Sequence, residues 1–289
     1  MAEADKPTRC GFVALIGAPN AGKSTLLNKL VGAKISIVSR KVQTTRTQVR
    51  GIALAGAAQV IFVDTPGIFA PKRRLDRAMV TSAWGGATDA DLIGVLIDVE
   101  RFDNEENTRL LEKLAELKQP KFLVLNKIDT IEKEKLLAIT TQLNERGKFE
   151  TTFMVAALTG YGVKDILDWL ETRLPLGPWL YPEDQNSDAP LRFLAAEITR
   201  EKIFERLHDE LPYRSTVETE QWQQRPDGSV RIEQTIYVER EGQRKIVLGA
   251  SEVVLRSNVA TPRANAFVRE LAAAFRGPVQ RLAVQRLPV

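Results

Sequence analysis

Short apolar runs alternate with longer amphipathic stretches over the first 175 residues. The apolar runs are rich in β-branched residues and predict strands at Phe12–Ile16, Gln59–Val63, Leu92–Asp98, Phe122–Leu125 and Thr152–Val155. Apolar positions at helical spacing between them predict helices at Ser24–Val31, Glu105–Leu117 and Lys133–Asn144. This alternation predicts an α/β fold with a doubly wound, mostly parallel sheet. In such folds ligands bind at the carboxyl ends of the strands.

A stretch rich in Pro, Gly and Asp, Leu174–Pro190, interrupts the alternation and indicates a linker. Beyond it the order of elements changes to that of an α+β domain. The elements predicted there are a helix at Leu191–Glu210, strands at Ser215–Gln223 and Val230–Glu239 joined by a hairpin turn, a helix at Arg263–Phe275 and a strand at Val279–Val284. We therefore expect a first domain over residues 1–175, a linker over 176–190 and a smaller domain over 191–289.

The composition, with 44% hydrophobic and 27% charged residues, is that of a soluble globular protein. The chain has no apolar run long enough to cross a membrane and no apolar segment typical of a signal peptide. Its single cysteine, Cys10, cannot form an internal disulfide and is expected to be a passive thiol. These features predict a cytoplasmic protein without an integral membrane segment.

Positive charge is concentrated at the end of the chain. Residues 240–289 contain nine basic and three acidic residues, a net charge of +6, although the whole chain carries only +4. A basic segment on a nearly neutral body indicates a polyanionic partner, for which nucleic acid is the first candidate. A solvated basic face without a partner is the alternative.

The residues from Gly17 to Ser24, GAPNAGKS, match the phosphate-binding pattern G-x-x-x-x-G-K-[ST], here called the P-loop. The match follows a predicted strand and opens a predicted helix, which is the context that the pattern requires. Lys23 is expected to contact the β- and γ-phosphate oxygens and Ser24 to bind Mg²⁺, so both are predicted to be catalytic. The residues predicted to surround the phosphates are Gly17, Asn20, Ala21, Gly22, Lys23, Ser24 and Thr25.

The second motif, Asp64-Thr65-Pro66-Gly67, ends the second predicted strand. An Asp at this place is expected to hold the Mg²⁺ shell. The N–H of Gly67 is placed to sense a γ-phosphate. Asp64 is therefore predicted as a metal ligand, and both residues as part of the nucleotide site.

The third motif, Asn126-Lys127-Ile128-Asp129, ends another predicted strand and selects the base. The Asp129 carboxylate can accept two hydrogen bonds from the N1–H and the exocyclic amine of guanine, a pair that adenine does not offer. Asn126 is expected to brace the neighbouring loops, and the aliphatic stem of Lys127 to lie against the ring. Three motifs in this order on successive strand ends predict a GTP site.

A polar loop between the first two motifs contains Thr44 and Thr45. A Thr from such a loop commonly completes the Mg²⁺ shell only in the triphosphate state. The spacing leaves both residues open, and Thr45 is favoured as metal ligand and catalytic residue. Ile68 follows Gly67 where many switch GTPases have a Gln that orients the attacking water, so slow intrinsic turnover is expected.

The segments GAPNAGKST, QTTR, DTPG, NKID and VAALTG are together similar to those of the Era family of bacterial GTPases. The resemblance covers about residues 10–249 and continues in Phe193–Glu210 and Val238–Lys245. It implies a Mg²⁺-dependent GTP hydrolase, a type II KH domain in the second half, and binding to the 3′ end of small-subunit ribosomal RNA and to the 30S precursor. Some members associate with the inner face of the membrane, so the resemblance also implies peripheral membrane association for this chain.

The resemblance also implies how the base and the phosphates are contacted. Ala156 and Ala157 are expected to aid guanine recognition, with Ala156 in place of the usual Ser. Family members with Asn at the position of Asn20 often use a monovalent cation near the phosphates. K⁺ is therefore expected to stimulate hydrolysis.

The chain departs from the family at the RNA-clamping loop of the KH domain, which needs the pattern G-x-x-G. Arg244, Lys245 and Gly249 are candidate RNA-binding residues, but Glu252 stands at the second glycine. A bulky, negative side chain opposes RNA phosphates at contact, so weak and strongly salt-dependent RNA binding is expected. Two explanations of the departure stay open, divergence of the family after about residue 249 and a disturbed reading frame.

The leading interpretation is an Era-like GTPase of ribosome assembly. The alternative is a GTP-dependent switch or checkpoint with negligible turnover and impaired RNA binding. A tRNA-modification GTPase of the same superfamily is disfavoured, because the extra N-terminal domain and the C-terminal Cys of that class are absent.

Overall fold

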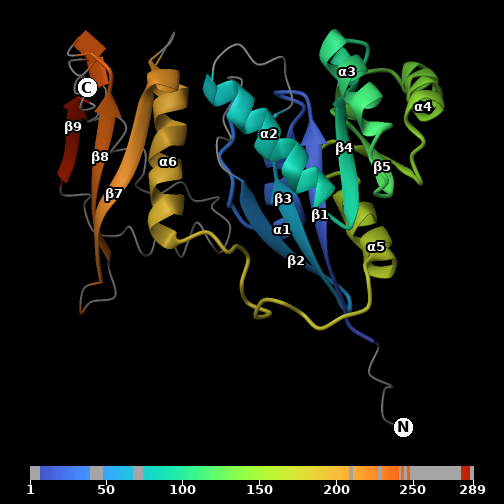
Figure 1. Cartoon of the computed structure of the whole chain (residues 1–289), viewed down its shortest axis with the longest axis horizontal. Coiled ribbons are helices and arrows are strands. Elements are labelled where there is room, and N and C mark those ends of the chain that lie inside the picture. The colour runs from blue at the N-terminus through green and yellow to red at the C-terminus, as the bar shows by residue number, and fades with distance from the viewer. Residues whose placement is uncertain are drawn as a thin grey trace. The chain divides into compact units, whose positions relative to one another are not determined.

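The structure, a computed structural model, describes residues 7–39, 48–67, 74–207, 211–224, 226, 230–240, 242–243, 246–247 and 281–286. The chain divides into two compact units (Figure 1). The first comprises Met1–Ser36 and Val42–Asp188, and the second comprises Ile37–Lys41 and Ala189–Val289.

The first unit is built on a six-stranded sheet in the order β2-β3-β1-β4-β5-β6 (Figure 1). The strands are β1 (Arg9–Gly17), β2 (Val49–Ala55), β3 (Ala58–Asp64), β4 (Leu92–Asp98), β5 (Lys121–Asn126) and β6 (Thr152–Val155). All neighbouring pairs are parallel except β2 with β3, which is antiparallel. Every residue of β3 and β4 is buried, as expected for strands covered on both faces.

Helices cover the two faces of this sheet. They are α1 (Lys23–Val31), α2 (Arg74–Thr88), α3 (Glu105–Leu114), α4 (Lys133–Gly147) and α5 (Val163–Arg173). Ala14 and Ile16 of β1 belong to a core cluster with apolar side chains of α2, α3 and α4. Val13 and Leu15 are equally buried and point the other way, because side chains alternate along a strand. On that side α1 and α5 contact each other and β3.

The strands and helices that were predicted in the first unit are all present. β4 and β6 have the predicted bounds. Three elements were missed, namely β2, α2 and α5, so the motif at Asp64 ends the third strand and not the second. Gly85 and Gly86 interrupt the helical pattern of α2, and Gly51 interrupts the strand pattern of β2, because glycine has a low propensity for both structures.

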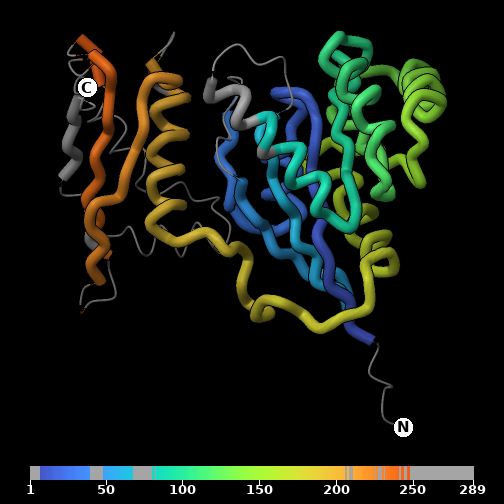
Figure 2. The backbone as a smooth tube through the Cα atoms, viewed as in Figure 1, coloured from blue at the N-terminus to red at the C-terminus, as the bar shows by residue number. Residues whose placement is uncertain are grey.

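The segment after α5, predicted as a linker over residues 176–190, lies along the first unit up to Asp188 (Figure 2). The fully buried amide of Gln59 in β3 donates to the carbonyl of Tyr181 at 2.7 Å and accepts from the N–H of Tyr181 at 3.0 Å. The N–H of Cys10 donates to the carbonyl of Pro175 at 3.1 Å. We therefore propose that the first domain extends to Asp188.

The second unit contains one long helix and a three-stranded sheet in the order β7-β8-β9. Its elements are α6 (Leu191–Arg206), the 3-10 turn η3 (Pro212–Arg214), β7 (Ser215–Gln224), β8 (Val230–Val238) and β9 (Arg281–Arg286). β7 and β8 form the predicted antiparallel hairpin, and β9 pairs with β8 in parallel, two residues further along the chain than predicted. The helix predicted to end at Glu210 ends earlier, at Arg206, because Leu207 already has extended backbone. The predicted helix Arg263–Phe275 lies outside the described residues.

Two further observations concern the membrane and the thiol. Among the described helices none is both long enough and apolar enough to cross a membrane. The thiol of Cys10 is buried beside Gln59, and burial raises its pKa. A raised thiol pKa favours the unreactive protonated form, which agrees with a passive cysteine.

Candidate nucleotide-binding site

The three motifs meet at one edge of the sheet. Gly17, Asp64 and Asn126 are the last residues of β1, β3 and β5. The three strands run parallel, so these residues all lie at the carboxyl edge of the sheet, where the register pairs Leu15 with Asp64 and Asp98 with Asn126. The sheet topology thus gathers residues that are about 100 positions apart in the sequence.

The P-loop turns sharply into α1. Asn20 and Gly22 both have positive φ, +62° and +97°, and α1 begins at Lys23 with no side-chain cap. A Cβ at Gly22 would lie 2.3 Å from Nδ2 of Asn126, so only glycine fits between the loop and β5. The first N–H groups of α1 have no partner within the helix, and the helix dipole favours negative charge at this end. The loop and helix together form a site for phosphate.

Lys23 lies inside this loop. Its ammonium donates to the carbonyls of Gly17 at 3.0 Å and Ala18 at 2.9 Å, and the residue is 7% exposed. Burial lowers its pKa to about 8, against the smaller opposing influence of the Asp64 and Glu106 charges. The ammonium therefore lies inside the P-loop, where the sequence pattern predicts contact with phosphate. Its burial removes the charge from water, which costs free energy.

Three oxygen-bearing side chains meet next to Lys23. The Ser24 hydroxyl donates to Oδ2 of Asp64 at 3.1 Å, and the Ser36 hydroxyl donates to the same oxygen at 2.7 Å. Asp64 is fully buried. An all-oxygen donor set with one carboxylate suits Mg²⁺, which prefers few protein ligands and completes its shell with phosphate and water.

The second motif is held against the P-loop strand. The Thr65 hydroxyl donates to the carbonyl of Leu15 at 2.8 Å, and a Cβ at Gly67 would approach backbone atoms of Pro19 to 3.1 Å. The Gly67 backbone therefore lies directly against the P-loop, as a contact with the terminal phosphate requires.

Asn126, the last residue of β5, links the P-loop to residues 155–160, here called the closing loop. Its Nδ2 donates to the carbonyl of Ala21 in the P-loop at 2.8 Å, and its Oδ1 accepts from the N–H of Ala157 at 3.0 Å. The side chain is 3% exposed, so both bonds are shielded from water. These bonds brace the P-loop and the closing loop against β5.

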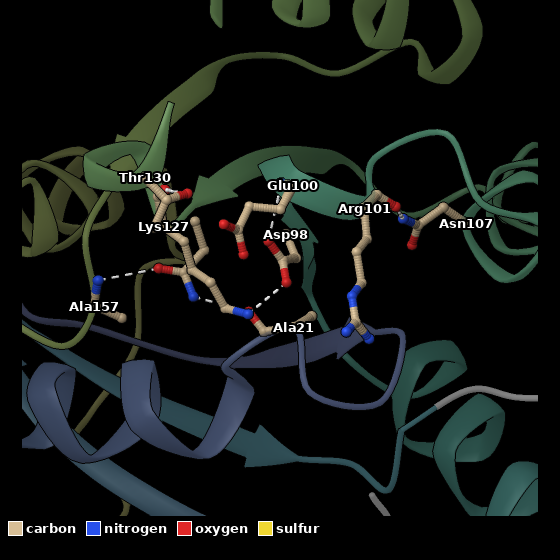
Figure 3. Close-up of polar contacts among 9 residues, drawn as sticks. Ala21, Asp98, Glu100, Arg101, Asn107, Lys127, Thr130 and Ala157 are labelled. Atoms are coloured by element: carbon tan, nitrogen blue, oxygen red, sulfur yellow. Dashed lines mark hydrogen bonds and ion pairs between the residues drawn. The ribbon is translucent and has the colours of Figure 1, made fainter. Parts of the chain in front are cut away.

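Lys127 and Asp129 differ in how they are held. Lys127 has a positive φ of 65°, unusual for a residue with a side chain, and its ammonium pairs with the carboxylate of Asp98 (Figure 3). Asp129 is exposed in the short turn η2 (Ile128–Thr130), and within the described part of the chain no group hydrogen-bonds its carboxylate. The carboxylate is available to a base.

The backbone N–H groups of Ala156 and Ala157 in the closing loop donate hydrogen bonds within the protein. The N–H of Ala156 donates to the carbonyl of Tyr161 at 3.1 Å, and the N–H of Ala157 donates to Asn126. A contact of either alanine with guanine remains a prediction. Thr44, Thr45 and Ile68, and the candidate RNA-binding residues Arg244, Lys245 and Gly249, lie outside the described residues.

Two buried polar residues of the site were not predicted, Ser36 and Asp98. Ser36 stands between Ile35 and Ile37, both buried, and an enclosed polar residue of this kind requires a hydrogen-bond partner. Asp98 ends a run of six apolar residues, the same signal that identified Asp64 and Asn126. Only the lack of a motif around Asp98 kept it from being recognised.

Comparisons with known proteins agree with this geometry. A family model described as a 50S ribosome-binding GTPase matches residues 12–127. GTPase Era of Rhizobium meliloti (strain 1021) is 65% identical over 84% of this chain and 78% of its own length. GTPase Era of Brucella suis biovar 1 (strain 1330) is 64% identical over 84% of this chain and 78% of its own length.

Two solved structures are similar over both units. An Era variant of Aquifex aeolicus bound to GDP and AlF4⁻ has a TM-score of 0.86 at 31% identity, covering 97% of this chain and 95% of that one. An Era in complex with MgGDPNP and nucleotides 1506–1542 of 16S ribosomal RNA has a TM-score of 0.85 at 32% identity, covering 97% and 94%. The predicted fold class, a P-loop GTPase domain followed by a smaller α+β domain, is confirmed.

Proposed function

The chain belongs to the Era family of GTPases, and from this membership we propose that it hydrolyses GTP and engages small-subunit ribosomal RNA and 30S precursors during ribosome assembly. The observation that supports the nucleotide part is the bracing of the P-loop and the closing loop by Asn126. The RNA part is supported by the similar Era that is bound to 16S ribosomal RNA nucleotides. Because ribosomal RNA and 30S precursors are the proposed partners, we infer that the protein acts in the cytoplasm.

In the proposed site the phosphates of GTP lie on the P-loop and beside Thr25, which follows it. Lys23 exchanges its bonds with the loop carbonyls for phosphate oxygens and stabilises the charge of the transferring phosphoryl group. Asp129 accepts two hydrogen bonds from guanine. The bound base buries the Asp129 carboxylate, which is exposed in the absence of nucleotide. Adenine would leave that carboxylate unpaired, which costs several kcal/mol and excludes the wrong base.

Ser24 and Asp64 are the proposed protein ligands of Mg²⁺, with Thr45 joining them in the GTP state. A bound Mg²⁺ would neutralise negative charge on the phosphates during phosphoryl transfer. Asn20 is the proposed protein contact of a K⁺ ion beside the phosphates. This assignment is based on the family resemblance, and Asn20 lies within the P-loop with a left-handed backbone conformation.

Multiple-turnover phosphate release tests the enzymatic part. Lys23→Ala and Ser24→Ala should each abolish GTP hydrolysis, whereas Lys29→Ala, an exposed position of the same helix, should hydrolyse GTP like the unaltered protein. Normal turnover in Lys23→Ala would contradict the P-loop assignment. Tight GTP binding by the unaltered protein without measurable phosphate release would favour the checkpoint alternative, in agreement with Ile68 at the position of the water-orienting Gln.

Co-sedimentation with 30S precursors in GTP and in GDP tests the RNA part. We expect binding that depends on the nucleotide and weakens steeply with salt, because Glu252 opposes close phosphate contact while the +6 charge of residues 240–289 attracts RNA at long range. Tight binding of the ribosomal RNA 3′ end that is insensitive to salt would show that Glu252 does not have this effect.

A further inference from the structure

Asp98 occupies the fourth strand end at the edge where the nucleotide motifs meet. It is the last residue of β4, 5% exposed, and pairs in register with Asn126 of β5. One carboxylate oxygen accepts from the N–H of Glu100 at 3.1 Å, and the other pairs with the ammonium of Lys127 (Figure 3). No motif includes Asp98, and neither the phosphates nor the guanine edge requires it.

We propose that Asp98 is a positioning residue for guanine binding, which holds the stem of Lys127 in the place where the base lies against it. This inference rests on the proposed function and deepens it. It assigns to Asp98 a share of the affinity for guanine nucleotides without contact between Asp98 and the nucleotide.

The carboxylate can hold Lys127 because it is itself held. The bond from Glu100 N–H fixes one oxygen of Asp98, so the other oxygen has a defined position. On the Lys127 side, the Thr130 hydroxyl donates to the carbonyl of Lys127 at 2.8 Å (Figure 3). The lysine is therefore fixed at its backbone and at its ammonium, and the four carbons between them form a defined surface.

An unpaired lysine would not offer such a surface. Its long side chain populates many rotamers in water, and ordering it on binding reduces affinity. The side chain of Lys127 is 35% exposed, so its surroundings alone do not confine it, whereas the Asp98 side chain is 7% exposed. A pair with one buried, fixed partner orders the exposed one before the base arrives. Loss of this ordering should weaken binding about three- to tenfold.

A purely structural role for Asp98 makes a different prediction. In that case its function would be to accept from Glu100 N–H at the start of the 3-10 turn η1 (Val99–Arg101). Asp98→Asn separates the two roles, because an amide oxygen still accepts from Glu100 N–H but carries no charge for Lys127. Lys127→Met removes the ammonium from the other side of the pair and keeps an apolar stem.

The experiment measures the dissociation constant of a fluorescent GDP analogue together with KM and kcat for GTP. Asp98→Asn and Lys127→Met should each raise the dissociation constant and KM about three- to tenfold and change kcat by less than about twofold, since neither group reaches the phosphates. The double variant should be no weaker than Lys127→Met alone. Glu100→Gln, which removes a neighbouring exposed charge but leaves the pair intact, is the matched control and should bind normally.

Three results would overturn the inference. The first is a GDP affinity of Asp98→Asn within about twofold of that of the unaltered protein. The second is an equal loss of GDP affinity from Asp98→Asn in the unaltered protein and in Lys127→Met. The third is a lower kcat of Asp98→Asn at unchanged KM. Failure of the unaltered protein to bind GDP would instead overturn the proposed function. If thermal melting shows that Asp98→Asn does not fold, Lys127→Met alone decides, and normal GDP affinity of that variant refutes the inference.

Discussion

We expect Lys23 to make nucleotide binding depend on pH in the range just above neutrality. Burial lowers the pKa of this ammonium to about 8 in the nucleotide-free protein. Phosphate oxygens beside the ammonium favour its charged form, so bound nucleotide raises the pKa again. Binding near pH 8 must therefore take up protons, because Lys23 is partly neutral before binding and charged afterwards.

The size of the effect follows from the protonated fraction of free Lys23. With a pKa of about 8, about 90% of the molecules carry the charge at pH 7, and about 9% carry it at pH 9. If only the charged form binds phosphate well, the association constant for GDP falls about tenfold over these two pH units, or about 1.4 kcal/mol. At pH 8 each binding event should take up about half a proton.

Titration of a fluorescent GDP analogue between pH 7 and pH 9 measures the fall in affinity. Calorimetry in two buffers with different ionisation enthalpies measures the proton uptake. Lys23→Arg is the control, because arginine stays charged over this range and any ionisation of the base affects both proteins alike. A flat profile for the unaltered protein, or the same slope in Lys23→Arg, would show that Lys23 is not the group that takes up the proton.

The folding equilibrium has the opposite dependence on pH. The pKa of Lys23 is depressed from 10.5 to about 8 in the folded protein, so between these values the unfolded chain binds more protons. The contribution of Lys23 to the free energy of unfolding of the nucleotide-free protein should therefore increase as the pH rises from about 8 to 10.5. A GDP affinity that falls while stability rises distinguishes this lysine from general alkaline unfolding.

Three further variants test the remaining parts of the site. Asp129→Asn should weaken GTP by about 2–4 kcal/mol and favour xanthosine nucleotides, and unchanged GTP affinity in equilibrium titration would remove Asp129 from the site. Asn126→Ala should lower the free energy of unfolding in urea by about 1–3 kcal/mol and also weaken GDP binding, because two buried hydrogen bonds are lost. An unaffected GDP affinity would refute the bracing role. K⁺ should stimulate hydrolysis over Na⁺ in the phosphate-release assay and Asn20→Ala should blunt the difference, whereas equal rates in the two salts would refute the assignment of K⁺.

The central strands could be predicted because their cause is local. β4 is apolar up to its last residue, Asp98, and burial on both faces of a parallel sheet requires that pattern, so its bounds were predicted to the residue. β2 lies at one edge of the sheet beside β3, and its sequence mixes Arg50 and Gly51 with apolar residues. Tertiary pairing forms this strand more than local propensity does, so the sequence pattern did not reveal it.

The site could be predicted where a motif carries the chemistry and not where only the fold brings groups together. Lys23 and Asn126 are placed by spacing and strand ends. Ser36 reaches Asp64 because Asn28 accepts from the N–H groups of Ile35 and Ser36, both at 2.9 Å, and so fixes the turn after α1. That arrangement depends on hydrogen bonds across a loop, for which the sequence has no periodic signal.

The contacts proposed for the described residues concern the base and the inner phosphates more than the choice between GDP and GTP. GDP and GTP share the guanine base and the two inner phosphates, so the contacts of Asn126, Asp129 and the P-loop with these groups are expected to contribute equally to both. A ligand shifts a conformational equilibrium only through interactions that differ between the states. Of the residues with described structure, Lys23 and Gly67 are the ones assigned to the γ-phosphate, and the backbone of Gly67 already lies against Pro19. A side chain at position 67 would meet the P-loop backbone, so we expect discrimination between GDP and GTP to depend on Lys23, on the backbone N–H of Gly67 and on the loop threonine that joins the Mg²⁺ shell.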